Sequence, residues 1–294
     1  MRQNSSGGGT TQKRTARPRH YLMCEPTFFD VSYSINPWMD PSRPTSTERG
    51  LTQWKTLHDL LVDLGHTVEL VEPVAGLPDM VYSANGATVV DGRALVARFR
   101  HEQRADESAT YLEWFRIRGW DFRQAEYVNE GEGDFLYAGD VLLAGTGFRS
   151  EPKAHGEVQE FFGKPVLGLT LVDERYYHLD TALAVLDENE IMYNPGAFSP
   201  QSRALLAEQF PDAILADAYD AEVFGLNAVS DGLHVIIPQQ AERLPGQLRE
   251  RGFVPVGIDM TELLKGGGGA KCCVLELRAP LAIPHSPKRE TENA

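Results

Sequence analysis

The feature that most constrains the fold is the order in which short β-like and helical segments follow one another. Segments with strand patterning are HTVELVEP, ATVVDGRALVARF, GDVLLAGTGF, TALAVLDENEIMYN and HVIIPQQ. Helical periodicity occurs in RGLTQWKTLHDLLVDLG, ESATYLEWFRIRG, KAHGEVQEFFG and QSRALLAEQF, and turn signals such as Asp91-Gly92 indicate hairpins between the strands. This strand, strand, helix, strand rhythm is typical of neither a doubly wound sheet nor a β-sandwich. With no legible sequence repeat, it predicts an α/β protein with mixed sheets.

Length and composition indicate a globular chain with one main domain. The 294 residues are 42% apolar and 24% charged, which is enough to bury a large core. No apolar run reaches the roughly 18 residues of a membrane span, and no apolar signal segment follows the basic N-terminus. We therefore expect a cytoplasmic protein, with a disordered tail over residues 1–18, a catalytic domain over 19–283 and a polar tail over 284–294.

The net charge of −14 argues against nucleic acid or an anionic membrane as a partner, because both attract clustered Lys and Arg. A small cationic ligand suits this charge better. The basic N-terminal tail leaves a nucleic-acid accessory role as a less favoured alternative, and the sequence leaves a homo-oligomer open.

Two of the three cysteines, Cys272 and Cys273, stand side by side after four glycines in KGGGGAKCC. A disulfide between neighbours strains the backbone, and no Cys-x-x-Cys or clustered His pair accompanies them, so a disulfide and a zinc site are both disfavoured. The remaining interpretations are a buried pair of small apolar residues and a nucleophile presented by a flexible loop.

A thiol nucleophile requires a proton-transfer partner and a carboxylate that orients this partner. Of eight histidines, His178 in LVDERYYHLDTALAVL is the best candidate, because it follows an aromatic run and precedes Asp180. A half-buried structural histidine is the alternative. In EYVNEGEGDFLYAGD, the carboxylates Glu130, Glu132 and Asp134 alternate with glycines. This pattern indicates either a solvated turn or, given the flanking aromatic residues, a partly buried cluster that could pair with an imidazole.

Together, the ordered motifs NEGEGD, HLDT and GGGGAKC resemble the guanidine-modifying superfamily of arginine deiminases, dimethylarginine dimethylaminohydrolases and amidinotransferases. MCEPTFFDVSYSINPWM, DMVYSAN, RFRHEQR, GTGFRS and LVDERYYHLD look like the bacterial dimethylarginine dimethylaminohydrolase type, and the likeness covers roughly residues 19 to 278. The resemblance implies a five-bladed pseudo-symmetric α/β propeller with the active site on its axis.

The resemblance also implies the catalytic roles. Cys272 matches the nucleophile and Cys273 becomes its packing neighbour. His178 would protonate the leaving nitrogen and later activate water, with Glu130 as the carboxylate that orients it. Because the family's four-residue acid-Gly-Gly-Asp form does not map cleanly onto five residues here, Glu132 remains the alternative orienting carboxylate.

Residues for substrate binding follow from the same resemblance. Asp79 and Asn85 fall where the family holds the guanidino nitrogens, and Asp180 falls where arginine deiminases place a second carboxylate. The expected partners of the substrate's α-carboxylate are Arg104 and Arg149. In addition, the segment INPWM, which contains Asn36, looks like the corresponding segment of the arginine dihydrolases.

Two departures bear on the choice of substrate. Asn85 replaces the usual Asp, and Asp180 stands where dimethylarginine-specific enzymes lack a carboxylate. A dimethylated nitrogen has no N–H group to donate to that carboxylate, so this pair favours unmethylated arginine.

The sequence therefore predicts a thiol-dependent hydrolase that acts on the guanidino group of arginine or an Nω-methylated arginine, without metal or organic cofactor. The expected intermediate is a thiouronium on Cys272. Dimethylargininase chemistry gives citrulline and an amine; arginine deiminase and arginine dihydrolase, which gives ornithine and ammonia, are the alternatives. An amidinotransferase or a non-catalytic guanidine-binding protein is less favoured.

Replacing each cysteine of the pair by serine tests which one is the nucleophile. Cys272→Ser is expected to abolish turnover, because a serine hydroxyl is not ionised as a thiol can be, whereas Cys273→Ser keeps most of it. Steady-state rates of both purified variants measure this. Equal losses would contradict the assignment of Cys272.

Overall fold

The computed structural model describes residues 14–279, which form five three-stranded sheets. In each sheet the middle strand runs antiparallel to an inner strand and parallel to an outer strand. From inner to outer strand, the sheets are β15 (Leu275–Glu276), β1 (His20–Cys24) and β2 (Thr67–Val71); β3 (Ala87–Val90), β4 (Arg93–Val96) and β5 (Asp121–Gln124); β6 (Phe135–Ala138), β7 (Val141–Thr146) and β8 (Val166–Thr170); β9 (Leu183–Val185), β10 (Ile191–Tyr193) and β11 (Ile214–Leu215); β12 (Val229–Ser230), β13 (His234–Pro238) and β14 (Val254–Ile258).

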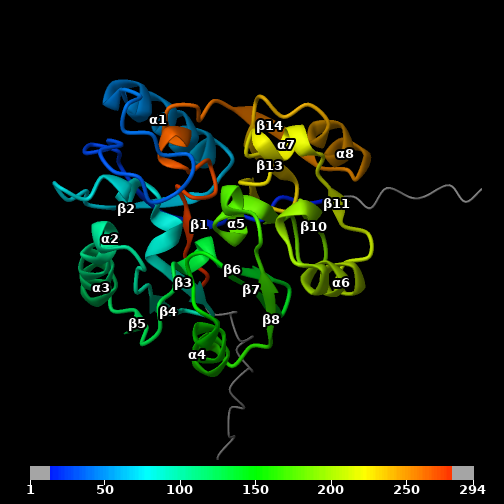
Figure 1. Ribbon diagram of the computed structural model, residues 1–294, viewed down its shortest axis with the longest axis horizontal. Coiled ribbons are helices and arrows are strands. Elements are labelled where there is room, and N and C mark those ends of the chain that lie inside the picture. The colour runs from blue at the N-terminus through cyan, green and yellow to red at the C-terminus, as the bar shows by residue number, and fades with distance from the viewer. Residues whose placement is uncertain (1–13, 280–294) are drawn as a thin grey trace, which may run out of the picture.

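Helices connect the middle strand of each sheet to its outer strand, as a parallel pair requires. Figure 1 shows these helices at the periphery, following one another round the molecule in chain order, with the inner strands toward the centre. The connecting helices are α1 (Thr47–Asp63), α2 (Glu102–Ala105) with α3 (Glu107–Ile117), α4 (Pro152–Phe162), α6 (Pro200–Gln209) and α8 (Leu244–Glu250), and the short α5 (Leu179–Ala182) and α7 (Ala218–Glu222) precede inner strands. The expected five-bladed α/β propeller is confirmed.

The predicted helices and hairpins correspond to α1, α3, α4 and α6 and to the hairpins β3–β4 and β9–β10. Asp91 and Gly92 have φ values of 51° and 78°, the positive values that a tight hairpin turn needs. The sequence pattern did not single out the outer strands β5, β8 and β14, whose side chains are mostly exposed or half-buried. It also did not single out the short strands β1, β6, β11, β12 and β15.

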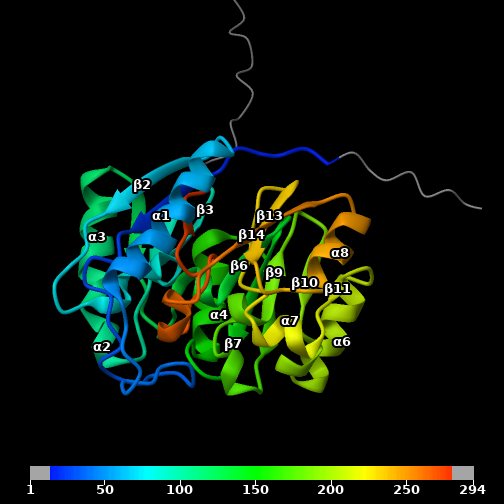
Figure 2. The ribbon, with the colours of Figure 1, turned by 90° about the horizontal axis from the view of Figure 1, so that it is seen from above.

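The first blade is completed by the end of the chain. β15 pairs antiparallel with β1, with Tyr21 opposite Glu276 and Leu22 opposite Leu275. This pairing brings the residues before β15 to the centre of the ring, beside residues that lie more than a hundred positions earlier. Figure 2 shows this C-terminal segment, in orange and red, between the blue α1 region and the green β6 region.

Residues 14–18, which belong to the predicted N-terminal tail, contact the folded part of the chain. Arg14 forms an ion pair with Asp187 and lies over the Phe253 ring, and Arg17 N–H donates to Asp231 O at 2.9 Å. These contacts fix residues 14–18 on the last two blades. The rest of the predicted N-terminal tail and the whole predicted C-terminal tail lie outside the described residues.

Helix α1 offers a matched test of the core. Leu57 is fully buried against β1, whereas Leu51 on the same helix is 37% exposed. Leu57→Ala is expected to lower the free energy of unfolding by about 2–5 kcal/mol, because it removes buried methyl groups and leaves a cavity. Leu51→Ala should lower the free energy of unfolding much less, because this side chain is already partly exposed. Urea denaturation of both variants measures the difference, and equal losses would contradict this packing.

Candidate active site

The candidate site is built from the five loops that precede the inner strands. Because the inner strands surround one axis, these loops meet at the same end of the ring. They carry Asn85 before β3, Glu130 to Asp134 before β6, His178 and Asp180 before β9, Asn227 before β12, and Cys272 before β15. The side chains of all these residues are buried.

The glycine run before Cys272 allows the loop to pass close to its neighbours. Gly267 has a φ of +93°, which favours glycine, and a Cβ on Gly268 would lie 2.3 Å from the Tyr82 ring. The loop is held in place by the Tyr177 hydroxyl, which donates to Gly267 O at 2.7 Å. The loop is therefore tightly packed, in contrast to the flexible loop that four glycines alone would suggest.

The Cys272 thiol lies between an acceptor and a donor. Its Sγ is 3.2 Å from Asp180 Oδ2, to which the S–H can donate, and 3.1 Å from Asn227 Nδ2. Burial and the Asp180 carboxylate raise the pKa of Cys272 well above its ordinary value, and burial raises the pKa of Asp180 to about 7. At neutral pH the resting thiol therefore keeps its proton. Cys273 is also a buried free thiol.

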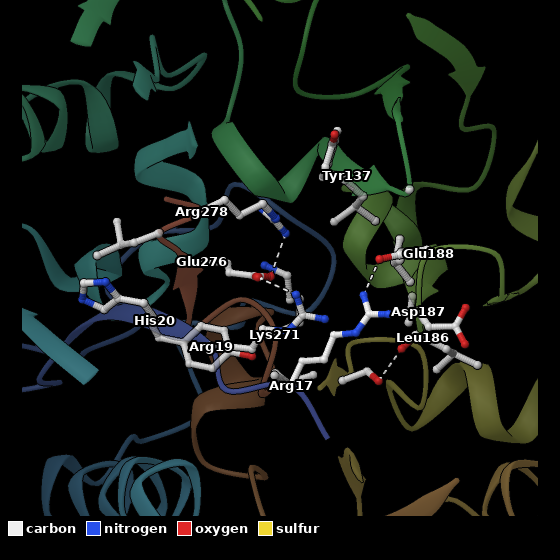
Figure 3. A pocket seen from close by; sticks show the side chains of 18 of the residues that line it. Arg17, Arg19, His20, Tyr137, Leu186, Asp187, Glu188, Lys271, Glu276 and Arg278 are labelled. Carbon is white, nitrogen blue, oxygen red and sulfur yellow. Dashed lines mark hydrogen bonds and ion pairs between the residues drawn. The ribbon is translucent and has the colours of Figure 1, made fainter. Parts of the chain in front are cut away.

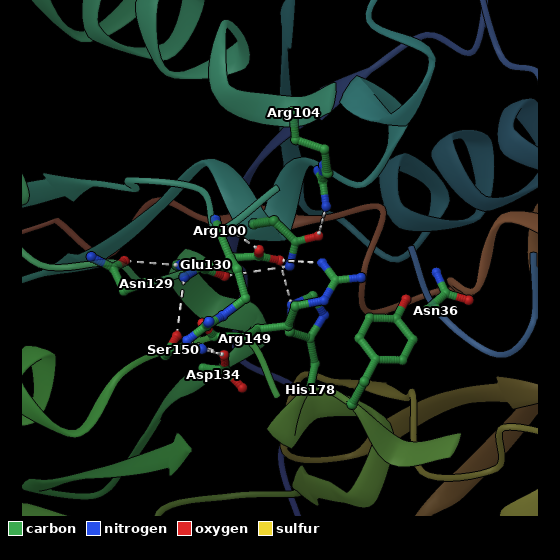
Figure 4. A network of polar contacts seen from close by, with 12 residues as sticks. Asn36, Arg100, Arg104, Asn129, Glu130, Asp134, Arg149, Ser150 and His178 are labelled. Atoms are coloured by element: carbon green, nitrogen blue, oxygen red, sulfur yellow. Dashed lines mark hydrogen bonds and ion pairs between the residues drawn. The ribbon is translucent and has the colours of Figure 1, made fainter. Parts of the chain in front are cut away.

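Glu130, Arg149 and His178 form a buried network (Figure 4). Glu130 Oε2 lies 2.7 Å from His178 Nε2 and 2.7 Å from Arg149 Nη1. Burial acts to raise the pKa of Glu130, but Arg149 and His178 outweigh it and hold this pKa well below its usual range. A carboxylate that accepts at Nε2 places the hydrogen there, which leaves Nδ1 with its lone pair in the neutral imidazole.

Asp134, two residues beyond Glu132, fixes the loop that carries His178. One oxygen accepts from Leu179 N at 3.1 Å, and the other accepts from the Ser150 hydroxyl at 2.6 Å. Asp134 therefore links the loop before β6 to the loop before β9.

Glu132 has different partners. Its carboxylate binds Lys271 Nζ at 2.8 Å, the Arg278 guanidinium and Glu276 N–H at 3.1 Å. These partners flank Cys272 on the closing segment of the first blade. The geometry therefore favours Glu130 over Glu132 as the carboxylate that contacts His178.

Arg104 is held by protein groups on nearly all sides. It makes two 2.8 Å hydrogen bonds to the Glu107 carboxylate, a third of 2.8 Å to Asn85 Oδ1 and one of 3.2 Å to Asp79 O. Arg149 likewise binds Glu130 and lies over the Tyr177 ring. Among the described residues, Arg104 donates four hydrogen bonds to protein acceptors and Arg149 donates two, to Glu130 and Ile35 O.

Three buried polar atoms of the site have no hydrogen-bond partner among the described residues. They are Asp79 Oδ1, Asp180 Oδ1 and His178 Nδ1. Buried polar groups are normally paired, and an exception calls for an explanation. The Asp180 oxygen, beside the thiol, and the Asp79 oxygen can each accept an N–H group of a small cation.

The segment between β1 and α1 contacts this site from several points. The Tyr33 hydroxyl donates to Asp79 Oδ2 at 2.9 Å, Asn36 Nδ2 donates to Gly266 O at 3.1 Å, and Ile35 O accepts from Arg149 at 3.0 Å. Asn36 therefore reaches the glycine loop beside the thiol.

A cavity of about 650 Å³ lies at the other end of the axis (Figure 3), lined by residues at the far ends of β6, β9, β12 and β15. Its wall contains ion pairs such as Arg17–Glu188 and Arg19–Glu276. Lys271 lines this cavity and binds Glu132, which is buried beyond it. The cavity is thus separate from the thiol site.

Within residues 14–279, no group of three or more His, Cys, Asp or Glu side chains could hold a metal ion. No helix in this range has the length and apolar character needed to cross a membrane.

The chain matches the family model described as "N,N dimethylarginine dimethylhydrolase, eukaryotic" over residues 34–279. It is 51% identical over 269 residues to the N(G),N(G)-dimethylarginine dimethylaminohydrolase of Mycobacterium tuberculosis, covering 92% of this chain and 89% of that protein. The chain belongs to the dimethylarginine dimethylaminohydrolase family.

The chain is also similar to an arginine dihydrolase and to solved structures. The bifunctional arginine dihydrolase/ornithine cyclodeaminase ArgZ of Synechocystis sp. is 36% identical over 88% of this chain, which spans 38% of ArgZ. The N-terminal domain of ArgZ has been solved as a Cys-to-Ser variant bound to substrate (TM-score 0.85, 35% identity, 89% of this chain and 99% of that one). An Asn-to-Ser variant of this domain, covalently bound to a reaction intermediate, has the same TM-score of 0.85. A dimethylarginine dimethylaminohydrolase adduct shares the fold, with TM-score 0.72 and 19% identity over 88% of this chain.

Replacing Glu132 by glutamine tests whether its ion pairs stabilise the fold. Its half-buried partners Lys271 and Arg278 would lose their counter-charge in Glu132→Gln, so we expect the free energy of unfolding to fall by about 3–5 kcal/mol at pH 7. Burial acts to raise the pKa of Glu132, but Arg278 and Lys271 outweigh it and lower this pKa from its ordinary value of 4.5. The contribution of Glu132 to the free energy of unfolding is therefore full above about pH 4.5, and it is lost as the pH falls through the lower pKa of the folded state.

Chemical denaturation between pH 3 and 7 measures this effect, and the variant should show a weaker loss of stability in acid. Glu113→Gln on α3 is the matched control, since the Glu113–Arg116 pair is exposed. Identical acid profiles for wild type and Glu132→Gln would contradict the prediction.

Proposed function

We propose that this protein is a thiol-dependent hydrolase that cleaves a C–N bond in the guanidino group of free arginine or an Nω-methylated arginine. The observation that carries the proposal is the buried group of Cys272, Asp180 and the Glu130–His178 pair, with unpaired acceptor atoms that suit a guanidinium. Membership of a family of C–N hydrolases supports it.

In the first half of the proposed reaction, the Cys272 sulfur attacks the central guanidino carbon. The thiol proton passes to His178 Nδ1, and His178 then delivers it to the leaving nitrogen. A C–S bond forms, a C–N bond breaks, and ammonia or an alkylamine departs. The product is a thiouronium on Cys272, in keeping with the covalent intermediate of the ArgZ domain.

In the second half, His178 removes a proton from water as the water oxygen attacks the same carbon. The C–S bond breaks, and the sulfur leaves as a thiolate and recovers a proton. The product carries a ureido group, as citrulline does. A second round on this group, with loss of another ammonia and carbon dioxide, would give ornithine.

Electrostatics favour attack only when substrate is present. The resting thiol is neutral, because burial and Asp180 raise its pKa. A guanidinium bound against Asp180 adds a positive charge beside the sulfur, which lowers the pKa of both groups and makes the thiolate accessible. A buried thiol of this kind is protected from side reactions until the cation arrives.

We assign Asp79 and Asp180 to the guanidino nitrogens, Asn85 and Asn36 to positions beside them, and Arg104 and Arg149 to the substrate carboxylate. Each arginine already binds a glutamate, so a substrate carboxylate would share its N–H groups with Glu107 or Glu130. The proposed compartment is the cytoplasm, where free thiols persist.

The unpaired Asp180 Oδ1 favours unmethylated arginine as the substrate. This oxygen requires an N–H donor, which each terminal nitrogen of arginine provides and a dimethylated nitrogen lacks. The second candidate, a dimethylargininase, is favoured by the 51% identity to the Mycobacterium tuberculosis enzyme of that name.

Product analysis separates these candidates. The purified protein is incubated separately with arginine, monomethylarginine and asymmetric dimethylarginine, and the products are measured by mass spectrometry. We expect kcat/KM for arginine to exceed that for asymmetric dimethylarginine by about 100-fold or more, because a buried acceptor is left unpaired by the methylated substrate.

Citrulline as the final product would identify a deiminase, and ornithine with ammonia would identify a dihydrolase. Efficient release of dimethylamine would contradict the role given to Asp180 and establish the dimethylargininase. Cys272→Ser is the control for turnover by contaminating enzymes.

A further inference from the structure

Asn227, which the sequence analysis did not single out, contacts the candidate nucleophile directly. It lies two residues before β12 and is fully buried. Its Nδ2 is 3.1 Å from Cys272 Sγ. Among the side chains of the described residues, Asn227 and Asp180 are the two that hydrogen-bond this sulfur.

The orientation of the Asn227 amide is fixed by its other partners. Oδ1 accepts from the backbone N–H groups of Gly269 and Cys272, both at 3.1 Å, and Nδ2 donates to Asp180 O at 3.0 Å. A backbone N–H can only donate and a carbonyl can only accept, so the amide cannot be reversed. One hydrogen of Nδ2 goes to Asp180 O, and the other is directed at the sulfur.

The loop that carries Asn227 is itself held in an unusual conformation. Phe224 is buried with a φ of 62°, a left-handed value that is uncommon for a bulky residue, and its carbonyl accepts from Asn227 N–H at 3.0 Å. Trp38 packs edge-on against the Phe224 ring. Such strain persists where the surrounding packing over-determines it, and here it sets the position of Asn227.

From these contacts we propose that Asn227 is a positioning residue for the nucleophile, and that its Nδ2–H holds the Cys272 sulfur and stabilises it as a thiolate. The inference rests on the proposed function for its role in turnover. A hydrogen bond to a charged acceptor is stronger than one to a neutral acceptor, so this donor favours the thiolate before attack and again when the sulfur leaves the thiouronium. The two bonds of Oδ1 keep the glycine loop from carrying the sulfur away.

Two variants separate the action on sulfur from the anchoring of the loop. Asn227→Asp keeps an acceptor for Gly269 N–H and Cys272 N–H but cannot donate to both Asp180 O and the sulfur; Asn227→Leu removes donor and acceptor. For Asn227→Asp we expect a lower melting temperature, because a carboxyl oxygen replaces a buried donor. We also expect a fall in kcat of about 10- to 100-fold with a much smaller change in KM, and a kcat profile shifted to higher pH.

Alkylation gives a readout that does not depend on turnover. The rate at which iodoacetamide modifies Cys272, located by mass spectrometry, is measured from pH 6 to 10. It should fall about 10-fold or more at pH 8 in Asn227→Asp, because the thiolate loses its donor. Asn194→Asp is the matched control, since Asn194 Oδ1 also accepts a backbone N–H, from Gly196, but outside the site.

The outcomes are distinct. Wild-type kcat, pH profile and alkylation rate in Asn227→Asp, with losses confined to a destabilised Asn227→Leu, would reduce Asn227 to a loop anchor and overturn the inference. If Asn227→Asp does not fold, an Asn227→Leu protein that alkylates and turns over at the wild-type rates would overturn it equally. If the wild type hydrolyses no guanidino compound, the proposed function fails, and the alkylation rates still decide whether Asn227 acts on the sulfur.

Discussion

The antiparallel pairing of β1 with β15 is the interaction on which the rest of the site depends. β15 contains only two residues, yet it closes the ring and delivers Cys272 to the loops of the other four blades. The pairing is supported by a 2.7 Å bond from Leu277 N–H to His20 O and by the Glu132 carboxylate, which accepts from Glu276 N–H and binds Lys271. The nucleophile is therefore placed by contacts that join the two ends of the described chain.

The charges of the site divide into paired and unpaired groups. Glu107 and Glu130 are each paired with a buried arginine. Arg149 and His178 outweigh burial and hold the pKa of Glu130 well below its usual range, whereas burial raises the pKa of Glu107 to about 7. Asp79 and Asp180 each retain an oxygen with no partner among the described residues, and burial raises the pKa of both. A protein that leaves two buried acceptors unpaired loses stability in the free state. A guanidinium recovers this loss on binding, which is a physical basis for selecting a cation.

The sequence predicted the parts of the fold that have strong local signals. Asp91-Gly92 marked a hairpin and the amphipathic helices were recognised, but β5, β8 and β14 and the short strands β1, β6, β11, β12 and β15 were missed, because two to five residues carry too little periodicity. The five-fold ring followed from family resemblance, since no periodicity specifies how blades close. Asn227 was missed because a lone asparagine has no motif. A usable signal was nevertheless present: Asn85 and Asn227 each stand two residues before an inner strand that leads to an Asp-Gly turn.

The ambiguity between Glu130 and Glu132 shows why spacing alone could not assign the site. Both lie in one glycine-rich turn, but Gly131 between them has a φ of +54°, and the two side chains diverge. Glu130 is directed to His178, whereas Glu132 is directed to the segment that carries Cys272. One short turn therefore contacts both His178 and the segment that carries Cys272. Because only Gly131 separates the two glutamates, the conformation of this one turn determines whether Glu130 reaches His178 and whether Glu132 reaches Lys271.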